Sequence, residues 1–132
     1  MTDEGTLAGG CLCGAVRFTA PATRRVVVNC HCGMCRRFHG HFGAYVLGAF
    51  DRLHFSEERG LAWYASSDKA RRGFCRICGS SLFWHATGGQ DIAIAAGALD
   101  QPTGLLTGAH IFVADKADYY EITDSLPQRE RW

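Results

Sequence analysis

The sequence lacks any long apolar run and any strong excess of charge. None of its apolar stretches approaches the roughly 20 residues that cross a bilayer, so we expect no membrane segment. Lysine and arginine total 14 against 13 acidic residues, which leaves a net charge of +1. This balance provides no bulk attraction to nucleic acid or to a membrane surface. The beginning of the chain is acidic and has no apolar stretch, so we predict no secretory signal and a cytoplasmic location.

Proline is scarce, with 3 residues, whereas glycine is frequent, with 16. Between the glycines the apolar residues alternate in short runs, which is typical of strands. Strands are expected at residues 14–20, 26–28, 42–47, 53–55, 61–65, 81–85, 91–96 and 110–113. Gly88-Gly89 predicts a hairpin between the sixth and the seventh of these. The predicted class is mainly β, as a single domain over residues 1–132, with a core of about 5–122 and a surface tail at 123–132.

Helical signals are brief. Residues 32–39 predict one or two helical turns that end at Gly40, a typical C-cap residue. Asp115 is expected to cap a second short helix. That helix would contain Ala117, Tyr119 and Tyr120.

Seven cysteines are unusual in a chain of this length. An odd number cannot pair completely within one chain, and in a reducing compartment clustered cysteines more often bind metal than form disulfides. The cysteines form three groups by spacing: Cys11 with Cys13; Cys30 with Cys32 and Cys35; and Cys75 with Cys78. Strand residues i and i+2 share a face, and a CxxC turn is equally tight. Both arrangements bring two sulfurs within the roughly 4 Å that a tetrahedral zinc site requires.

Seven ligands divide most simply into four and three. A closed structural zinc site would use Cys11, Cys13, Cys75 and Cys78. The local trio of Cys30, Cys32 and Cys35 would then hold a second zinc with one position open, which is the catalytic pattern. Other interpretations stay open: a redox dithiol, a single metal cluster or iron–sulfur centre, or closure of the trio by His31, His39 or His41.

An open three-thiolate zinc site carries a net charge of −1 and binds a further thiol as its thiolate. It thereby supplies a sulfur nucleophile at neutral pH or stabilises a sulfur leaving group. Arginines near the cysteine motifs, Arg36, Arg37, Arg71 and Arg72, are expected either to offset this charge and clamp substrate carboxylates or to be solvated surface residues. The candidate catalytic residues beyond the ligands are His31, Arg36 and His39, although His31 alternates with two ligands and suits a hydrogen-bonded structural role better.

The three cysteine motifs, at residues 9–16, 30–37 and 73–82, together resemble the glutathione-dependent formaldehyde-activating family, which also includes centromere protein V. The resemblance extends over nearly the whole chain, to residues 109–113. It implies a β-rich, tent-like fold. It also implies a structural zinc on Cys11, Cys13, Cys75 and Cys78 and a catalytic zinc on Cys30, Cys32 and Cys35.

The activity that this resemblance implies is the condensation of formaldehyde with glutathione, which is a carbon–sulfur lyase reaction in reverse. We therefore expect a zinc enzyme with two zinc ions that acts on a small thiol such as glutathione. The alternative is a non-catalytic zinc module that binds a protein or a small ligand. Binding to nucleic acid or to the cytoskeleton is not expected, because the chain has no basic extension.

Overall fold

The computed structural model describes residues 5–132, and strands dominate this range. The strands are β1 (Thr6–Gly10), β2 (Arg17–Cys30), β3 (Gly43–Ala49), β4 (His54–Glu57), β5 (Leu61–Ala65), β6 (Ala70–Cys75), β7 (Ser81–Ala86), β8 (Asp91–Ala95) and β9 (Thr107–Ile111). A single α-helix in this range, α1 (Gly33–His39), follows β2. Short 3-10 turns lie at Phe50–Arg52, Ala96–Ala98 and Val113–Asp115. The mainly β class that the sequence predicts is confirmed.

Strand β2 pairs with different neighbours along its length. Its first half pairs antiparallel with β1 and β4, where Phe18 lies opposite Phe55. Its second half pairs antiparallel with β3 and parallel with β9, so that Cys30 lies opposite both Gly43 and Ile111. Register shifts between the two halves bend the strand. The sequence predicted two separate strands here, and the bulged β2 joins them.

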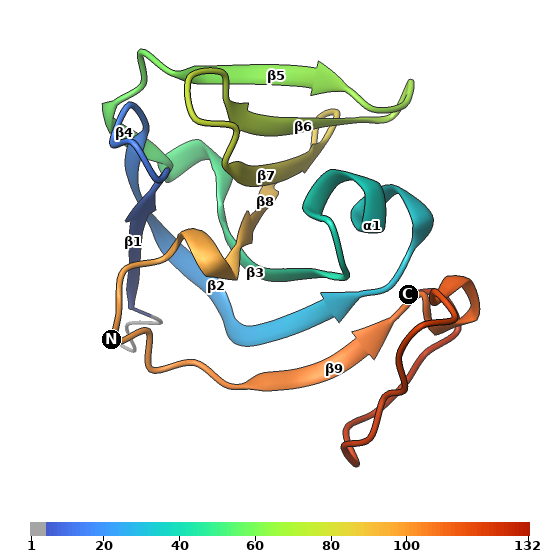
Figure 1. The fold of residues 1–132 in the computed structure, drawn as a ribbon. Helices are drawn as coiled ribbons and strands as arrows, with labels where there is room; N and C mark the ends of the chain where they lie inside the picture. The colour runs from blue at the N-terminus through green and yellow to red at the C-terminus, as the bar shows by residue number, and fades with distance from the viewer. Residues whose placement is uncertain (1–4) are drawn as a thin grey trace.

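The sheet continues from β2 through β3, β8, β7 and β6 to β5. The predicted hairpin is confirmed, because β7 and β8 pair antiparallel with Phe83 opposite Ile94. In Figure 1 the strands β5, β6 and β7 form an upper layer, while β9 and the second half of β2 cross the lower part of the molecule. Helix α1 lies between these two parts. The helix is thus framed by strands from distant parts of the sequence.

The main core fills the space where β2, β7 and β8 meet. Phe18 and Phe83 contact each other edge to face, with ring centroids 5.0 Å apart, and Leu82, Ile92 and Ile94 are completely buried. Full burial of each such side chain stabilises the fold by roughly 1.5–3 kcal/mol. Cys75 belongs to the same buried cluster, so one cysteine group lies directly against the core.

The predicted helix over residues 32–39 is confirmed. Cys32 is its N-cap, and the Cys32 Sγ atom accepts a hydrogen bond from the backbone N–H of Cys35. The helix ends at Gly40, whose φ of 87° is favourable for glycine. The second predicted helix is wrong, because the Lys116 ammonium donates to the carbonyls of Ala117 and Tyr120 and holds that segment in a turn.

Two strands were not predicted. Strand β1 consists mainly of small residues, and at Gly9 a side chain would collide with the Ala98 carbonyl, 2.2 Å from the position of a Cβ atom. Strand β6 contains Arg71 and Arg72, and a pair of charged residues does not have the apolar alternation that indicates a strand. Pairing with β5 and β7 on both sides stabilises β6 despite this composition.

The C-terminal segment turns back along β9. Phe112 adopts a left-handed backbone conformation with φ of 55°, which ends the strand at Ile111. The backbone N–H of Phe112 then donates to the carbonyl of Arg131, and that of Arg129 donates to His110. Most of residues 123–132 are exposed. No helix within residues 5–132 has the length and apolar character needed to cross a membrane.

Candidate functional site

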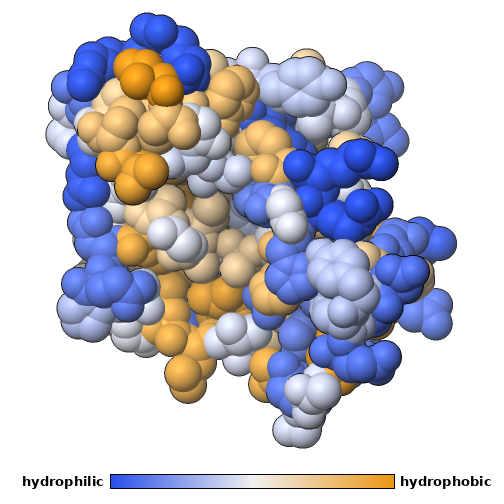
Figure 2. Space-filling view, in the orientation of Figure 1, coloured by the Kyte–Doolittle hydropathy of each residue, from blue (hydrophilic) through white to orange (hydrophobic). Residues whose placement is uncertain are grey.

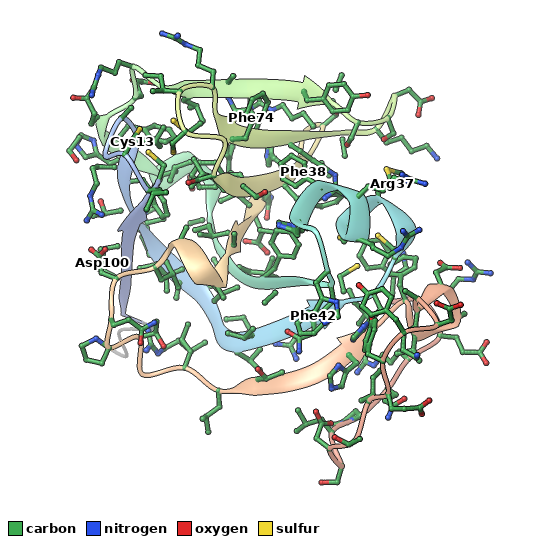
Figure 3. All side chains as sticks on the ribbon, viewed as in Figure 1. Cys13, Arg37, Phe38, Phe42, Phe74 and Asp100 are labelled. Atoms are coloured by element: carbon green, nitrogen blue, oxygen red, sulfur yellow. The ribbon has the colours of Figure 1, made fainter. Side chains whose placement is uncertain are left out.

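The sulfurs of Cys11, Cys13, Cys75 and Cys78 converge, all lying within 4.8 Å of one another. Cys11 and Cys13 lie in the turn after β1, whereas Cys75 is the last residue of β6 and Cys78 lies in the turn that follows. The Sγ atom of Cys13 is 3.7 Å from that of Cys11 and 3.8 Å from that of Cys75. Backbone N–H groups of Val16 and Cys78 donate to two of these sulfurs, which favours thiolates. Figure 3 shows these sulfurs near Cys13 at the upper left.

The second group consists of Cys30, Cys32 and Cys35, whose sulfurs also lie within 4.8 Å of one another. Cys30 is the last residue of β2, Cys32 caps α1, and Cys35 lies in the first turn of α1. Hydrogen bonds from Cys30 and Cys35 lower the pKa of Cys32 to about 2. A thiolate held among thiols in this way is a suitable metal ligand. Within residues 5–132, no histidine, aspartate or glutamate joins these three sulfurs at that distance.

None of the seven cysteines, all of which lie within the described part of the chain, forms a disulfide. The two groups therefore have the composition of two potential metal-binding sites, one with four sulfur donors and one with three. The separation of the groups is visible in Figure 3, where one set of sulfurs lies by Cys13 and the other beside α1. Both groups fit zinc, because thiolates are its preferred soft ligands and the sulfur spacing suits a tetrahedron.

Arg72 forms a buried wall of the three-cysteine group. Its side chain is on β6, and the residue is only 4% exposed. Both terminal nitrogens face the Cys35 sulfur, at 3.8 and 3.9 Å, and Nη1 also donates to the Tyr45 hydroxyl at 3.3 Å. Burial alone would lower the pKa of Arg72, but Tyr45 and Cys35 beside it raise that pKa above its usual value. Arg72 is therefore a permanent positive charge at Cys35.

His39 completes this network from the other end of α1. The Tyr45 hydroxyl, which accepts from Arg72, also forms a hydrogen bond with His39 Nε2. Burial, together with the charge of Arg72, lowers the pKa of His39 to about 4, and burial raises the pKa of Tyr45. His39 and Tyr45 are thus both neutral at pH 7.

His31 belongs to a different network on the far side of the cysteine motif. Its Nδ1 atom lies 2.5 Å from the Tyr120 hydroxyl, and its Nε2 atom lies 2.9 Å from His110 Nδ1. His110 in turn bonds to the carboxylate of Asp124. Burial and the neighbouring His110 lower the pKa of His31 to about 4. Both ring nitrogens of His31 are therefore engaged by protein groups, which favours the structural interpretation.

A pocket of about 360 Å³ opens beside the three-cysteine group. Its walls come from α1, β5 and β6 together with the loop between the two strands: Met34, Arg37, Phe38, Tyr64, Ser66 and Arg72. Arg36 is half-buried on α1 and is not among these residues. Arg71 points away from Arg72 and stacks on Trp63 at 4.0 Å, as the alternation of a strand requires.

Tyr64, Ser66 and Tyr120 are the residues near the site that the sequence did not indicate. Tyr64 and Ser66 reach the pocket because β5 pairs with β6, and Tyr120 reaches His31 because the chain reverses after β9. The only local signal was the aromatic character of residues 119–120, where the sequence predicted a helix. Contacts between residues this far apart in the sequence cannot be predicted from residue spacing.

Fold and site together describe a mainly β protein built around two cysteine clusters with the donor chemistry of metal sites. A model of the family described as glutathione-dependent formaldehyde-activating enzyme matches residues 6–115. The chain therefore belongs to this family, as the cysteine motifs indicated.

Two further comparisons agree with this assignment. A protein of Schizosaccharomyces pombe described as an uncharacterized lyase is 30% identical over 118 residues, covering 88% of this chain and 85% of the relative. The crystal structure of a Rhodobacter sphaeroides protein, a structural genomics target, superposes with a TM-score of 0.63 at 17% identity. That alignment covers 92% of this chain and 98% of the other, and at this identity it shows a common fold.

Proposed function

We propose that this chain is a zinc-dependent carbon–sulfur lyase-type enzyme that joins a small thiol to an aldehyde such as formaldehyde, and releases them in reverse. The sulfur of the thiol forms a bond to the aldehyde carbon, the C=O π bond becomes a C–O single bond, and the thiol proton ends on the new hydroxyl. Family membership and the lyase description of the yeast relative support this reaction class.

The observation that carries the proposal is the difference between the two cysteine groups. Four sulfurs converge in one group, whereas three converge in the other without a further protein donor among residues 5–132. We assign the group of Cys11, Cys13, Cys75 and Cys78 to a structural zinc, and Cys30, Cys32 and Cys35 to a catalytic zinc. A zinc held by three thiolates supplies a fourth position at which a substrate thiol binds as its thiolate.

The surrounding residues suit a site that gathers negative charge. Arg72 is buried with its terminal nitrogens at the Cys35 sulfur, and a charge in such a dry setting acts more strongly than in water. Tyr45 accepts a hydrogen bond from the guanidinium, and His39 bonds in turn to Tyr45. His39 is neutral and can accept a proton transiently. Of the predicted catalytic candidates His31, Arg36 and His39, we favour His39, because it bonds to the Tyr45 hydroxyl that contacts Arg72.

A test combines metal analysis with exchange kinetics. The wild type and Cys35→Ser are compared for zinc per chain and for the rate at which glutathione and its formaldehyde adduct interconvert, measured by exchange NMR above the uncatalysed rate. We expect two zinc ions and acceleration in the wild type, and one zinc ion and no acceleration in a folded Cys35→Ser. Unchanged zinc content and turnover in the variant would contradict the proposal. Two zinc ions without any acceleration in the wild type would favour a binding module instead.

A further inference from the structure

The three-cysteine group is held from behind by His31, which lies between its first two cysteines and is only 2% exposed. In extended backbone the side chains alternate, so the His31 ring points away from the sulfurs on either side of it. Its backbone N–H donates to the carbonyl of Ile111 at 3.0 Å. The two ring nitrogens bond to Tyr120 and His110, at 2.5 and 2.9 Å. Groups outside the motif therefore fix both the backbone and the ring of the residue that links two ligands.

Both partners of this ring depend on residues 116–132, which we call the C-terminal clasp and which lie beyond the end of the matched family model. Tyr120 is part of the clasp. His110 is on β9, but its Nε2 atom bonds to the carboxylate of Asp124 at 2.9 Å, and its carbonyl accepts from the backbone N–H of Arg129. The clasp thus contacts the ring once directly and once through His110.

The Tyr120 hydroxyl is held in a defined position, although the residue is only half-buried. The Lys116 ammonium donates to the carbonyls of Ala117 and Tyr120 and lies 4.6 Å from the centre of the Tyr120 ring. The same ring contacts those of His41 and Phe42, with centroids 4.6 and 6.3 Å away. Contacts on several sides therefore orient Tyr120 before any ligand or metal is bound.

The clasp lies close to one cysteine group and far from the other. Phe112, just before the clasp, packs against the buried cluster that contains Cys30 and Cys35, and the Trp132 ring covers Phe112 at 5.1 Å. In Figure 1 the clasp is the red segment at the lower right, beyond the end of β9, whereas Figure 3 shows the sulfurs near Cys13 at the upper left. Loss of a contact in the clasp should therefore affect the three-cysteine group selectively.

We propose that the C-terminal clasp positions the three-cysteine group, with Tyr120 as its positioning residue. The hydroxyl acts through His31 and holds the backbone between the first two ligands in the conformation that binds metal. This inference rests on the proposed function, because that proposal assigns zinc to this group. A group with three protein donors has one bond fewer to its metal than a closed group of four. Its retention of zinc depends correspondingly more on ligands that are already in place.

The first test compares two neighbouring hydroxyl groups. Tyr120→Phe removes the partner of His31, whereas Tyr119→Phe removes a hydroxyl that bonds to His41 Nδ1 at 2.7 Å. Transfer of zinc from each full-length protein to a chromophoric chelator is followed by absorbance, and the phase of the three-cysteine group is the one that Cys35→Ser lacks. We expect this phase to be roughly tenfold faster in Tyr120→Phe, since groups that orient metal ligands commonly change metal affinity by roughly 10–100-fold. It should be unchanged in Tyr119→Phe.

The second test uses the other contact of the clasp and a conservative replacement. Asp124→Ala should accelerate the same phase, because His110 loses the carboxylate to which it bonds. Asp124→Asn should restore most of the retention, since its amide oxygen still accepts a hydrogen bond. Asp118→Ala is the control, because Asp118 is an exposed carboxylate of the same clasp. In Co²⁺-loaded protein, Tyr120→Phe should also change the visible absorption bands of the three-cysteine group, and Tyr119→Phe should not.

A purely structural contribution has a different signature. It would accelerate zinc release from both groups, in step with a lower urea midpoint, whereas positioning accelerates release from the three-cysteine group alone. Equal release rates in Tyr120→Phe and Tyr119→Phe, or acceleration of both phases together, overturns the positioning role even if the protein is an active lyase. Selective acceleration in Tyr120→Phe supports that role even if the wild type does not accelerate the exchange of glutathione with its formaldehyde adduct.

Discussion

The Nε2 atom of His31 lies 2.9 Å from Nδ1 of His110, and this hydrogen bond fastens the three-cysteine motif to β9. The donor and acceptor roles in this series of hydrogen bonds follow from its last member, because the Asp124 carboxylate only accepts. His110 therefore donates to Asp124, His31 donates to His110, and Tyr120 donates to His31. The matched family model ends at residue 115, so Tyr120 and Asp124 are contributed by the segment beyond it.

Removing the His110 side chain from this series of hydrogen bonds should destabilise the fold. In His110→Ala, the buried N–H of His31 loses its acceptor, which costs about 1–3 kcal/mol. Urea unfolding measures the loss as a lower midpoint. His54→Ala is the matched control, because His54 lies exposed on β4 and its removal should change the free energy of unfolding by less than about 0.5 kcal/mol. Equal midpoints for the two variants would contradict a structural role for this series of hydrogen bonds.

The sequence predicted the parts of the molecule that local spacing determines. Helix α1 and its end at Gly40 followed from a capping residue, and the β7–β8 hairpin followed from Gly88-Gly89. The convergence of the cysteines also agrees with the division into four and three, although the metals themselves stay a prediction. Each of these features depends on contacts between close neighbours or on a residue type with few structural roles.

The features that were not predicted depend on contacts between side chains and distant partners, which the sequence does not reveal. Strand β6 has charged residues in its middle, yet Arg72 is buried because Tyr45 and Cys35 receive its guanidinium. The expected helix at residues 117–120 is a turn because the Lys116 side chain bonds back to nearby carbonyls. In both cases a long side chain satisfies polar groups at a distance, which overrides the local propensity.

Stability should fall as the solution becomes acidic, in part through His39. Its pKa is about 4 in the folded protein against the ordinary histidine value of 6.5, so the unfolded chain binds the additional proton between these values. The free energy of unfolding then decreases as pH falls from 6.5 through 4, by at most about 1.4 kcal/mol per pH unit from one such group. Urea unfolding between pH 7 and 4.5 should show a shallower dependence for His39→Gln than for the wild type. Parallel curves would show that His39 does not contribute.

Gly60 is predicted to be essential for the position of Cys75. A Cβ atom at Gly60 would lie 2.8 Å from the Cys75 sulfur and 2.8 Å from the Cβ atom of Ala15. Gly60→Ala should therefore cost about 1–3 kcal/mol and reduce zinc retention in the four-cysteine group. Gly97→Ala is the control, because a Cβ atom there meets nothing within 4 Å. Urea unfolding and zinc analysis of the two variants measure the difference, and identical behaviour would show that the site tolerates the methyl group.

The surface above the four-cysteine group carries exposed apolar side chains. Leu12 and Ile77 lie between the paired cysteines of the two turns and are 89% and 53% exposed, and Figure 2 shows apolar surface at the upper left, over these turns. Apolar side chains that face water do not stabilise the turns that carry them. We therefore expect a bound metal to contribute to the convergence of the sulfurs.

Cys13→Ser tests this requirement. Its sulfur lies 3.8 Å from that of Cys75, which is 62 residues away in the chain, so a zinc ion there would crosslink two distant turns. Binding of structural zinc contributes about 10–16 kcal/mol, as much as the total stability of a typical domain. Thermal unfolding followed by circular dichroism should therefore show a severe loss of structure in Cys13→Ser, and a chelator should have the same effect on the wild type. Cys32→Ser, in the other group, should unfold much closer to the wild-type temperature, because that group is assigned to a catalytic zinc and not to a structural one. If Cys13→Ser kept both its melting temperature and its zinc, the four-cysteine group would have no structural metal.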